Sequence, residues 1–191
     1  MKYVLASNNK NKIAEIKKML DGKAELLSLA DCGLNVDVEE TGVTFEENAL
    51  IKAKTISSLT NMPAIADDSG LEVDALNGAP GVYSARFAGE QHNDEDNRQK
   101  LLALMKEVPF EKRTANFTTC IAVAYPNGKT ITVFGRTYGK ITTEYRGNGG
   151  FGYDCLFLSN DLGITFGEAT PDQKNAVSHR GRALKELSKI L

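Results

Sequence analysis

The stretch Ala64-Ile65-Ala66-Asp67-Asp68-Ser69-Gly70 joins a short apolar run to two adjacent acidic residues. The apolar run predicts a buried β-strand, and Ser69-Gly70 predicts a turn directly after it. Because successive side chains of a strand point to opposite faces, at most one of the two carboxylates faces a given site. Neighbouring carboxylates also repel each other, and a divalent cation would offset that cost. We therefore expect a carboxylate site at a sheet edge, with a simple polar strand end as the alternative.

The composition limits the class of protein. The chain has 191 residues, of which 41% are hydrophobic and 25% charged, as is typical of a soluble globular protein. This length predicts one domain or two tightly packed lobes. A net charge of −2 argues against a protein that coats nucleic acid. Three widely spaced cysteines predict neither a disulfide framework nor a zinc site. No apolar run is long enough to span a bilayer and no signal peptide is evident, so we expect a cytoplasmic protein.

The N-terminal segment has the order strand, turn, helix. Residues Lys2–Ser7 are strand-like, Asn8-Asn9 can cap a helix, and apolar residues then follow at helical spacing. A helix start presents unpaired N–H groups, which bind phosphate readily. Lys10 and Lys12 lie near this start, where the helix dipole disfavours cations unless an anion is present. This mismatch favours an anionic ligand, although chance placement on a solvated face remains the alternative.

A second acidic pair, Glu39-Glu40, ends another strand-like segment, Val36–Glu40, which follows an expected strand at Glu25–Leu29. Thr44-x-x-Glu47 then forms a capping box that begins a helix running to about Leu59. The apolar face of this helix comprises Phe45, Ala49, Ala53, Ile56 and Leu59.

Lys52 falls in the middle of this apolar face. A buried ammonium group costs several kcal/mol, roughly, unless it is paired or solvated. We therefore expect Lys52 either to extend its tip to solvent or to bind an anionic ligand.

The second half of the chain reads mostly as antiparallel sheet. We expect a helix over Asp94–Lys106 and strands over Thr114–Tyr125, Thr130–Arg136 and Tyr138–Tyr145. The run 147–152 matches G-x-G-x-x-G, but it precedes a strand-like segment and not a helix, so it predicts a flexible loop and not a dinucleotide site.

Near the C-terminus, Ser178 can cap a last helix. His179 and Arg180 would occupy the first turn of that helix, again against its dipole. Cations at two helix starts make a shared anionic ligand more credible than either would alone. There is no P-loop, no G-x-S-x-G elbow and no H-E-x-x-H motif in the sequence.

Six blocks of sequence together resemble the inosine triphosphate pyrophosphatase family, which acts on non-canonical purine nucleoside triphosphates. The match covers essentially the whole chain in the right order, and its blocks are Ser7-Asn8-Asn9-x-x-Lys12, Glu40-Thr41-Gly42-x-Thr44-Phe45-x-x-Asn48-Ala49-x-x-Lys52-Ala53, Ala66-Asp67-Asp68-Ser69-Gly70-Leu71, Gly78-Ala79-Pro80-Gly81-Val82-Tyr83-Ser84-Ala85-Arg86, Gly149-Gly150-Phe151-Gly152-Tyr153-Asp154 and Ser178-His179-Arg180.

The resemblance implies an α/β fold over residues 1–191. It implies one elongated domain of two lobes, with a long mixed β-sheet flanked by helices and a central nucleotide cleft. It also implies a homodimer that binds a small nucleotide, and neither nucleic acid nor a membrane. The implied reaction is the Mg²⁺-dependent hydrolysis of ITP, dITP and XTP to the nucleoside monophosphate and pyrophosphate.

The resemblance also implies roles for particular residues. Asp68 would be the general base and a metal ligand, with Glu39 or Glu40 as the other metal ligand. The substrate-binding residues would be Ser7, Asn8, Asn9, Lys10, Asn11, Lys12, Lys52, Ser69, Phe151, Gly152, Tyr153, Asp154, Lys174, His179 and Arg180. Two other functions remain open from the sequence: a pyrophosphatase for another modified or pyrimidine nucleotide, and a nucleotide-binding regulator without turnover.

Overall fold

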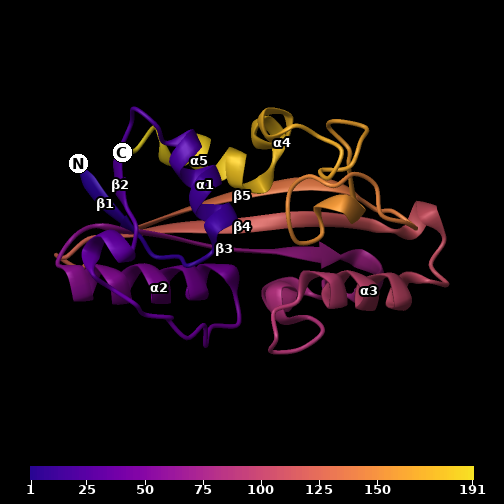
Figure 1. The fold of residues 1–191 in the computed structure, drawn as a ribbon, viewed down its shortest axis with the longest axis horizontal. Helices are drawn as coiled ribbons and strands as arrows, with labels where there is room; N and C mark the ends of the chain where they lie inside the picture. The colour runs from indigo at the N-terminus through magenta and orange to yellow at the C-terminus, as the bar shows by residue number, and fades with distance from the viewer. The chain divides into compact units, whose positions relative to one another are not determined.

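The computed structural model describes residues 1–191 and contains one six-stranded sheet in the order β2-β1-β3-β4-β5-β6. This confirms the α/β class and the mixed sheet, since β1 is parallel to β2 and β3 whereas β5 and β6 are antiparallel. Figure 1 labels β1 to β5 of this sheet. The strands are β1 (Lys2–Leu5), β2 (Glu25–Leu27), β3 (Ala64–Val73), β4 (Thr114–Ala124), β5 (Thr130–Ile141) and β6 (Phe157–Ser159). The α-helices are α1 (Lys10–Met19), α2 (Phe45–Thr60), α3 (Asp94–Met105), α4 (Pro171–Val177) and α5 (His179–Leu187).

The chain forms two compact units, each built from separate stretches of sequence. Unit 1 comprises Met1–Asp68, Thr119–Gly135 and Arg182–Leu191. Unit 2 comprises Ser69–Thr118 and Arg136–Gly181.

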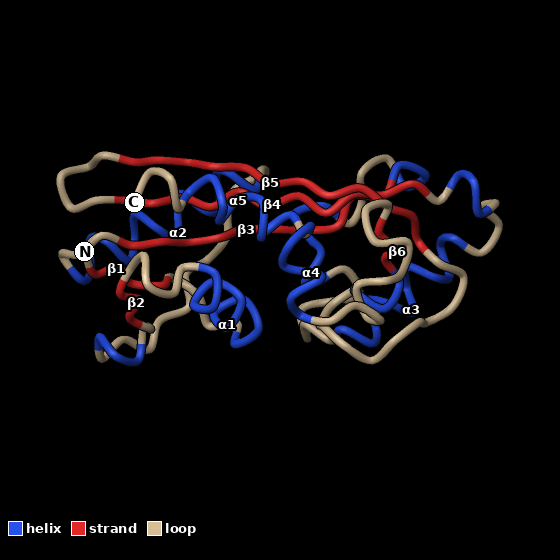
Figure 2. The backbone as a smooth tube through the Cα atoms, turned by 90° about the horizontal axis from the view of Figure 1, so that it is seen from above, coloured by secondary structure: helices blue, strands red, loops and turns tan.

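In unit 1 the strands bury apolar side chains on both faces. Tyr3 and Leu5 of β1 belong to one core cluster, together with residues of α1 and of the C-terminal part of α5. Val4 points to the opposite face, as the alternation of a strand requires. Figure 1 shows α2 on that opposite face. The N-terminus of α2 has the predicted capping box between Thr44 and Glu47. Figure 2 shows the turn that joins strands β4 and β5.

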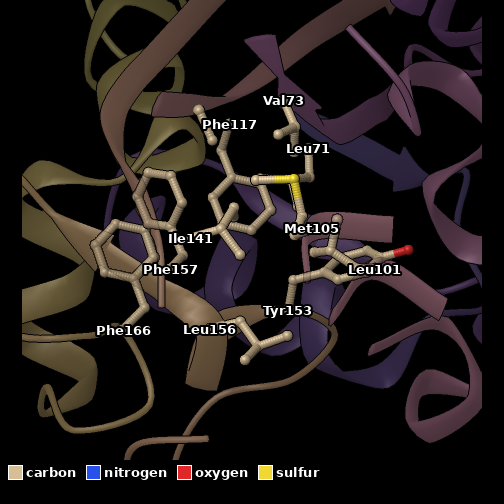
Figure 3. Packing of buried hydrophobic residues seen from close by; sticks show 11 residues of the cluster. Leu71, Val73, Leu101, Met105, Phe117, Ile141, Tyr153, Leu156, Phe157 and Phe166 are labelled. Carbon is tan, nitrogen blue, oxygen red and sulfur yellow. The ribbon is translucent and has the colours of Figure 1, made fainter. Parts of the chain in front are cut away.

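In unit 2 the core is rich in aromatic residues (Figure 3). Phe117 of β4 lies 4.7 Å, between ring centroids, from Phe157. Phe166 lies 5.1 Å from Phe157. Leu101 and Met105, one turn apart on α3, pack into the same cluster, as the helical spacing predicted. This core fixes α3 against the strands and the segment that follows the glycine-rich loop.

Several expectations about secondary structure are wrong. Ser69-Gly70 makes no turn, because β3 continues through both residues to Val73. The segment 36–40 forms no strand, and Tyr138 belongs to β5, which runs without a break to Ile141. Residues 154–156 form a 3₁₀ turn before the short strand β6. Leu59, assigned to the buried face of α2, is 56% exposed.

No helix in the structure is both long and apolar enough to cross a membrane.

Candidate functional site

Asp67 and Asp68 lie in β3 at the point where its neighbour β1 has ended. The last paired residues are Leu5 and Ile65, and the amide of Ala6 still donates to the Ile65 carbonyl at 2.8 Å. Asp67 and Asp68 follow after Ala66, and both are buried. The predicted edge position is therefore present, but it comes from the shortness of β1 and not from a turn in β3.

The Asp67 carboxylate lies next to the start of α1. Lys12 Nζ is 3.4 Å from Asp67 Oδ1. The Asn9 side chain accepts hydrogen bonds from the amides of Asn11 and Lys12, so Asn9 is the helix cap that the sequence predicted. Lys12 thus offsets the charge of a buried acid, whereas Lys10 is exposed.

Lys52 reaches from α2 to the acidic residues. Its Nζ lies 2.5 Å from Glu40 Oε1 and 3.8 Å from Asp68 Oδ1, and it donates to the Asp67 carbonyl at 2.8 Å. Burial lowers the pKa of this ammonium, but the carboxylates of Asp68, Glu40 and Asp67 more than offset that effect, so the pKa is raised. Lys52 is therefore charged and held by carboxylates, which excludes the fully solvated alternative.

Asn48 is a buried residue beside Asp68 that the sequence analysis did not assign to the site. Its Nδ2 donates to Asp68 Oδ2 at 3.2 Å, and its Oδ1 accepts from the amide of Gly42 at 2.8 Å. Asn48 therefore connects the segment carrying Glu40 to the Asp68 carboxylate. The sequence contained a signal for it, because Asn48 precedes Lys52 by four residues and so shares its helix face.

Gly42 fits tightly against this asparagine. A Cβ atom at Gly42 would lie 2.7 Å from Asn48 Oδ1 and 2.6 Å from the Cβ of Glu47. Only glycine brings this backbone so close to α2. We call Glu40, Asp67, Asp68, Lys12, Lys52 and Asn48 the acidic cluster.

The Asp68 carboxyl has a raised pKa. Burial raises its pKa to about 6, although Lys52 and Lys12 oppose the shift. An acid with such a pKa gives up its proton near neutral pH and can accept one from a reactant there.

The acidic cluster presents ligands that suit a hard divalent cation. Carboxylate oxygens of Glu40 and Asp68 both approach one cation, the Lys52 ammonium, whereas Glu39 is exposed. No group of three or more His, Cys, Asp or Glu side chains in the structure is arranged to hold a metal ion by itself. Mg²⁺ needs no such protein cage, since it commonly takes one or two carboxylates and completes its shell with water and substrate phosphate. The residues therefore fit Mg²⁺ delivered with a phosphorylated ligand.

A second group of predicted residues meets in unit 2. Lys174 Nζ lies 2.6 Å from Asp154 Oδ2 and 4.5 Å from the centre of the Phe151 ring. The Phe151 amide also donates to Asp154 Oδ2, at 2.9 Å. At Gly150, φ is +71° and a Cβ would lie 2.0 Å from Asp154 Oδ2, so this loop position requires glycine.

Arg180 and His179 belong to the same unit. The Arg180 Nη2 donates to the Ser69 hydroxyl at 2.9 Å, and its guanidinium carbon is 5.9 Å from the Phe151 ring centre. The His179 ring stacks on Phe117 at 4.9 Å. Ser178 accepts from the Gly181 amide, which confirms it as a cap. We call Phe151, Asp154, Lys174 and Arg180 the aromatic-cation cluster.

Tyr153 differs from its neighbours in the glycine-rich loop. Its side chain lies in the core of unit 2, and its hydroxyl donates to the Ser84 carbonyl at 2.7 Å. The Tyr153 ring is therefore part of the hydrophobic core of unit 2.

Comparison with known proteins gives one consistent result. The model of the Ham1 family matches residues 3–190. A dITP/XTP pyrophosphatase of Geobacter sulfurreducens is 53% identical over 187 residues, which cover 97% of this chain and 94% of that protein. One of Bacillus subtilis is 47% identical and covers 98% of this chain and 96% of that protein.

Solved structures agree with the sequence matches. The Ham1 protein of Staphylococcus aureus matches with a TM-score of 0.89 and 39% identity over 100% of this chain and 97% of that one. A HAM1 protein from Coxiella burnetii matches with a TM-score of 0.90 and 40% identity over 100% of this chain and 98% of that one.

Proposed function

We propose, because this chain belongs to the Ham1 family, that it hydrolyses dITP, XTP and ITP to the nucleoside monophosphate and pyrophosphate. The observation that carries this proposal is the acidic cluster, in which Lys12 and Lys52 lie beside the buried carboxylates of Asp67 and Asp68. Such a mixture of carboxylates and ammonium groups suits a ligand that combines phosphate oxygens with a divalent cation.

The acidic cluster would bind the triphosphate. Lys12 and Lys52 would stabilise negative charge on the departing pyrophosphate, because phosphoryl transfer depends mainly on positioning and electrostatics. The segment from Ser7 to Asn11, at the N-terminus of α1, would donate hydrogen bonds to phosphate oxygens from its polar side chains and amides. Lys10, which is exposed, would add positive charge there.

Glu40 and Asp68 would hold Mg²⁺, and Glu40 is the better of the two candidate glutamates because it contacts Lys52 whereas Glu39 is exposed. When bound, Mg²⁺ supplies positive charge that neutralises phosphoryl oxygens. The Asp68 carboxylate would orient the attacking water and accept its proton. Asn48 would keep the Asp68 carboxylate in position.

The aromatic-cation cluster would recognise the base. Phe151 would stack on the purine, and Arg180 or His179 would donate to the 6-keto oxygen that hypoxanthine and xanthine share. Adenine has an amino group at that place, which would present a second donor to the same side chains. Gly152, Tyr153, Asp154 and Lys174 would shape this site, and Ser69, which directly follows Asp68 in the chain, would contact the nucleotide.

We also propose that the protein acts in the cytoplasm, without nucleic acid or a membrane, because its proposed substrates are free nucleotides. The homodimer that the family resemblance implies is part of the same proposal. Size-exclusion chromatography with light scattering measures the oligomeric state, and a monomer at micromolar concentration would contradict the homodimer.

A substrate panel tests the proposed specificity. The values of kcat/KM for dITP, XTP and ITP should exceed those for ATP, GTP and dUTP, with Mg²⁺ present. A preference for dUTP would favour a pyrimidine nucleotide pyrophosphatase. Tight binding without turnover of any nucleotide would favour a regulator.

A further inference from the structure

The first two turns of α3 hold the glycine-rich loop that carries Phe151. The Gly152 amide donates to Asp94 Oδ2 at 3.0 Å, and the Gly152 carbonyl accepts from Arg98 Nη1 at 2.8 Å. The amide and the carbonyl of Gly152 are thus both hydrogen-bonded to α3, through two side chains that lie one helical turn apart. Hydrogen bonds to charged partners are stronger than neutral ones, so this attachment is firm.

Arg98 is itself held in place. Its Nη2 and Nε donate to Glu95 Oε2 at 2.9 and 3.3 Å. The hydroxyl of Tyr145 donates to the other oxygen of Glu95 at 2.9 Å, and the guanidinium carbon lies 5.6 Å from the Tyr145 ring centre. Tyr145 precedes the glycine-rich loop and Gly152 ends it. Side chains of α3 therefore contact the chain at both ends of the glycine-rich loop. We call Asp94, Glu95 and Arg98 the α3 clamp.

The residues after Gly152 are anchored independently. The Tyr153 side chain packs with Leu101 and Met105 in the core (Figure 3), and the Asp154 carboxylate bonds to Lys174. On the N-terminal side of Phe151, the Gly149 amide donates to the Gly167 carbonyl at 2.8 Å, and the Phe151 amide itself donates to Asp154 Oδ2 at 2.9 Å. On its C-terminal side the clamp holds Gly152. The backbone that carries the Phe151 ring is therefore fixed jointly by Asp154 and by the clamp.

We infer that Asp94 and Arg98 are positioning residues for base recognition, which act by fixing the backbone beside Phe151. This inference rests on the proposed function, because it requires Phe151 to stack on a purine. Neither side chain needs to touch the nucleotide. Without the hydrogen bonds to Gly152, the Phe151 ring could adopt several positions in the free protein. Binding of the nucleotide would then also have to order the loop, which would lower the affinity.

The test compares Arg98→Met and Asp94→Ala with two matched controls. Lys100→Met and Asp96→Ala remove the same charges from exposed positions on the same helix. We expect both clamp variants to raise KM for ITP about tenfold, the order expected when a charge-assisted hydrogen bond is lost. The kcat and the melting temperature should stay close to those of the controls. Arg98→Lys should recover part of the loss, because its ammonium group can still donate to the Gly152 carbonyl.

Two further readouts separate positioning from general damage. Tripolyphosphate has no base, so its inhibition constant should not change in the clamp variants. Hydrogen exchange should become faster at the amides of Phe151 and Gly152 in the ligand-free protein. The inference is overturned if KM for ITP equals that of the controls, if KM and the tripolyphosphate constant rise together, or if exchange at these amides is unaltered. A wild-type protein that hydrolyses none of ITP, dITP and XTP would refute the proposed function and this inference with it, whereas an active wild type with unaffected variants refutes the inference alone.

Discussion

The side-chain amide of Asn48 donates a hydrogen bond to the carboxylate of Asp68, at 3.2 Å, and only 1% and 4% of these residues' surfaces are exposed. Because Asn48 also accepts from the Gly42 amide, one side chain fixes the distance between two segments that bear acids. Asp68 thereby keeps a defined orientation although it lies among charged neighbours.

Asn48→Ala should lower kcat by about tenfold to a hundredfold, because a buried carboxylate that loses its orienting donor samples unproductive positions. It should also lower the free energy of unfolding by about 1–3 kcal/mol, since Gly42 and Asp68 lose a partner. Steady-state kinetics and urea unfolding measure the two effects. Ser57→Ala is the control on the same helix, because the buried Ser57 hydroxyl has no hydrogen-bond partner. A wild-type kcat in Asn48→Ala would remove Asn48 from the mechanism.

Asp68→Asn should abolish turnover while stabilising the metal-free protein at neutral pH. The folded-state pKa of Asp68 is raised from 3.8 to about 6, so the folded protein binds this proton more tightly than the unfolded chain. Ionised Asp68 therefore destabilises the fold increasingly as pH rises from about 4 to about 6, and by about 3 kcal/mol above that range.

Urea unfolding with a chelator present measures this linkage. The stabilisation by Asp68→Asn, relative to wild type, should be larger at pH 7.5 than at pH 4.5. Equal differences at the two pH values would contradict the raised pKa. Turnover by Asp68→Asn at the wild-type rate would contradict its role as the base.

Lys52→Met should reduce both activity and stability. It leaves the buried carboxylate of Asp68 and the partly buried carboxylate of Glu40 without their shared cation. Breaking a buried pair in this way costs about 3–5 kcal/mol. Adding Asp68→Asn should restore part of that stability, because it removes one of the uncompensated charges, and the two changes will be non-additive. The control is Lys54→Met, an exposed lysine two residues along α2. If Lys52→Met unfolds at the same urea concentration as Lys54→Met, the charge network contributes nothing to the fold.

Arg180→Gln should reduce the discrimination between ITP and ATP. A site built around a specific hydrogen bond can reject the wrong partner by about 10⁴ or more, because its own polar groups are left unpaired. We expect the ratio of kcat/KM values for the two nucleotides to fall by at least about tenfold. A ratio that stays at the wild-type value would assign base recognition to other residues.

The sequence predicts best where local chemistry and tertiary structure agree. The Thr44–Glu47 capping box and the Asn9 cap appear as expected, because each is a local contact. Helix periodicity correctly places Lys52 beside buried residues of α2, and its ammonium group contacts carboxylates of the protein itself. These predictions need only a few consecutive residues. Binding of an anionic ligand by Lys52 stays a prediction.

Predictions fail where the pairing of strands that are distant in sequence overrides the local conformational preference of the residues. Ser69-Gly70 favours a turn, yet both continue β3, because a strand held between neighbours tolerates a glycine that local statistics assign to a turn. Val36–Glu40 has the pattern of a strand but lies outside the sheet order. The choice between Glu39 and Glu40 depends on Lys52, twelve residues away from Glu40, and no local pattern contains that contact.

The most direct test of the central claim is hydrolysis of ITP in ¹⁸O-labelled water, with Mg²⁺, followed by identification of every product. Attack of water on the α-phosphate predicts IMP and pyrophosphate as the only products, with the label in IMP. Release of orthophosphate with IDP, or label found in pyrophosphate, would show attack at another phosphorus and would contradict the account.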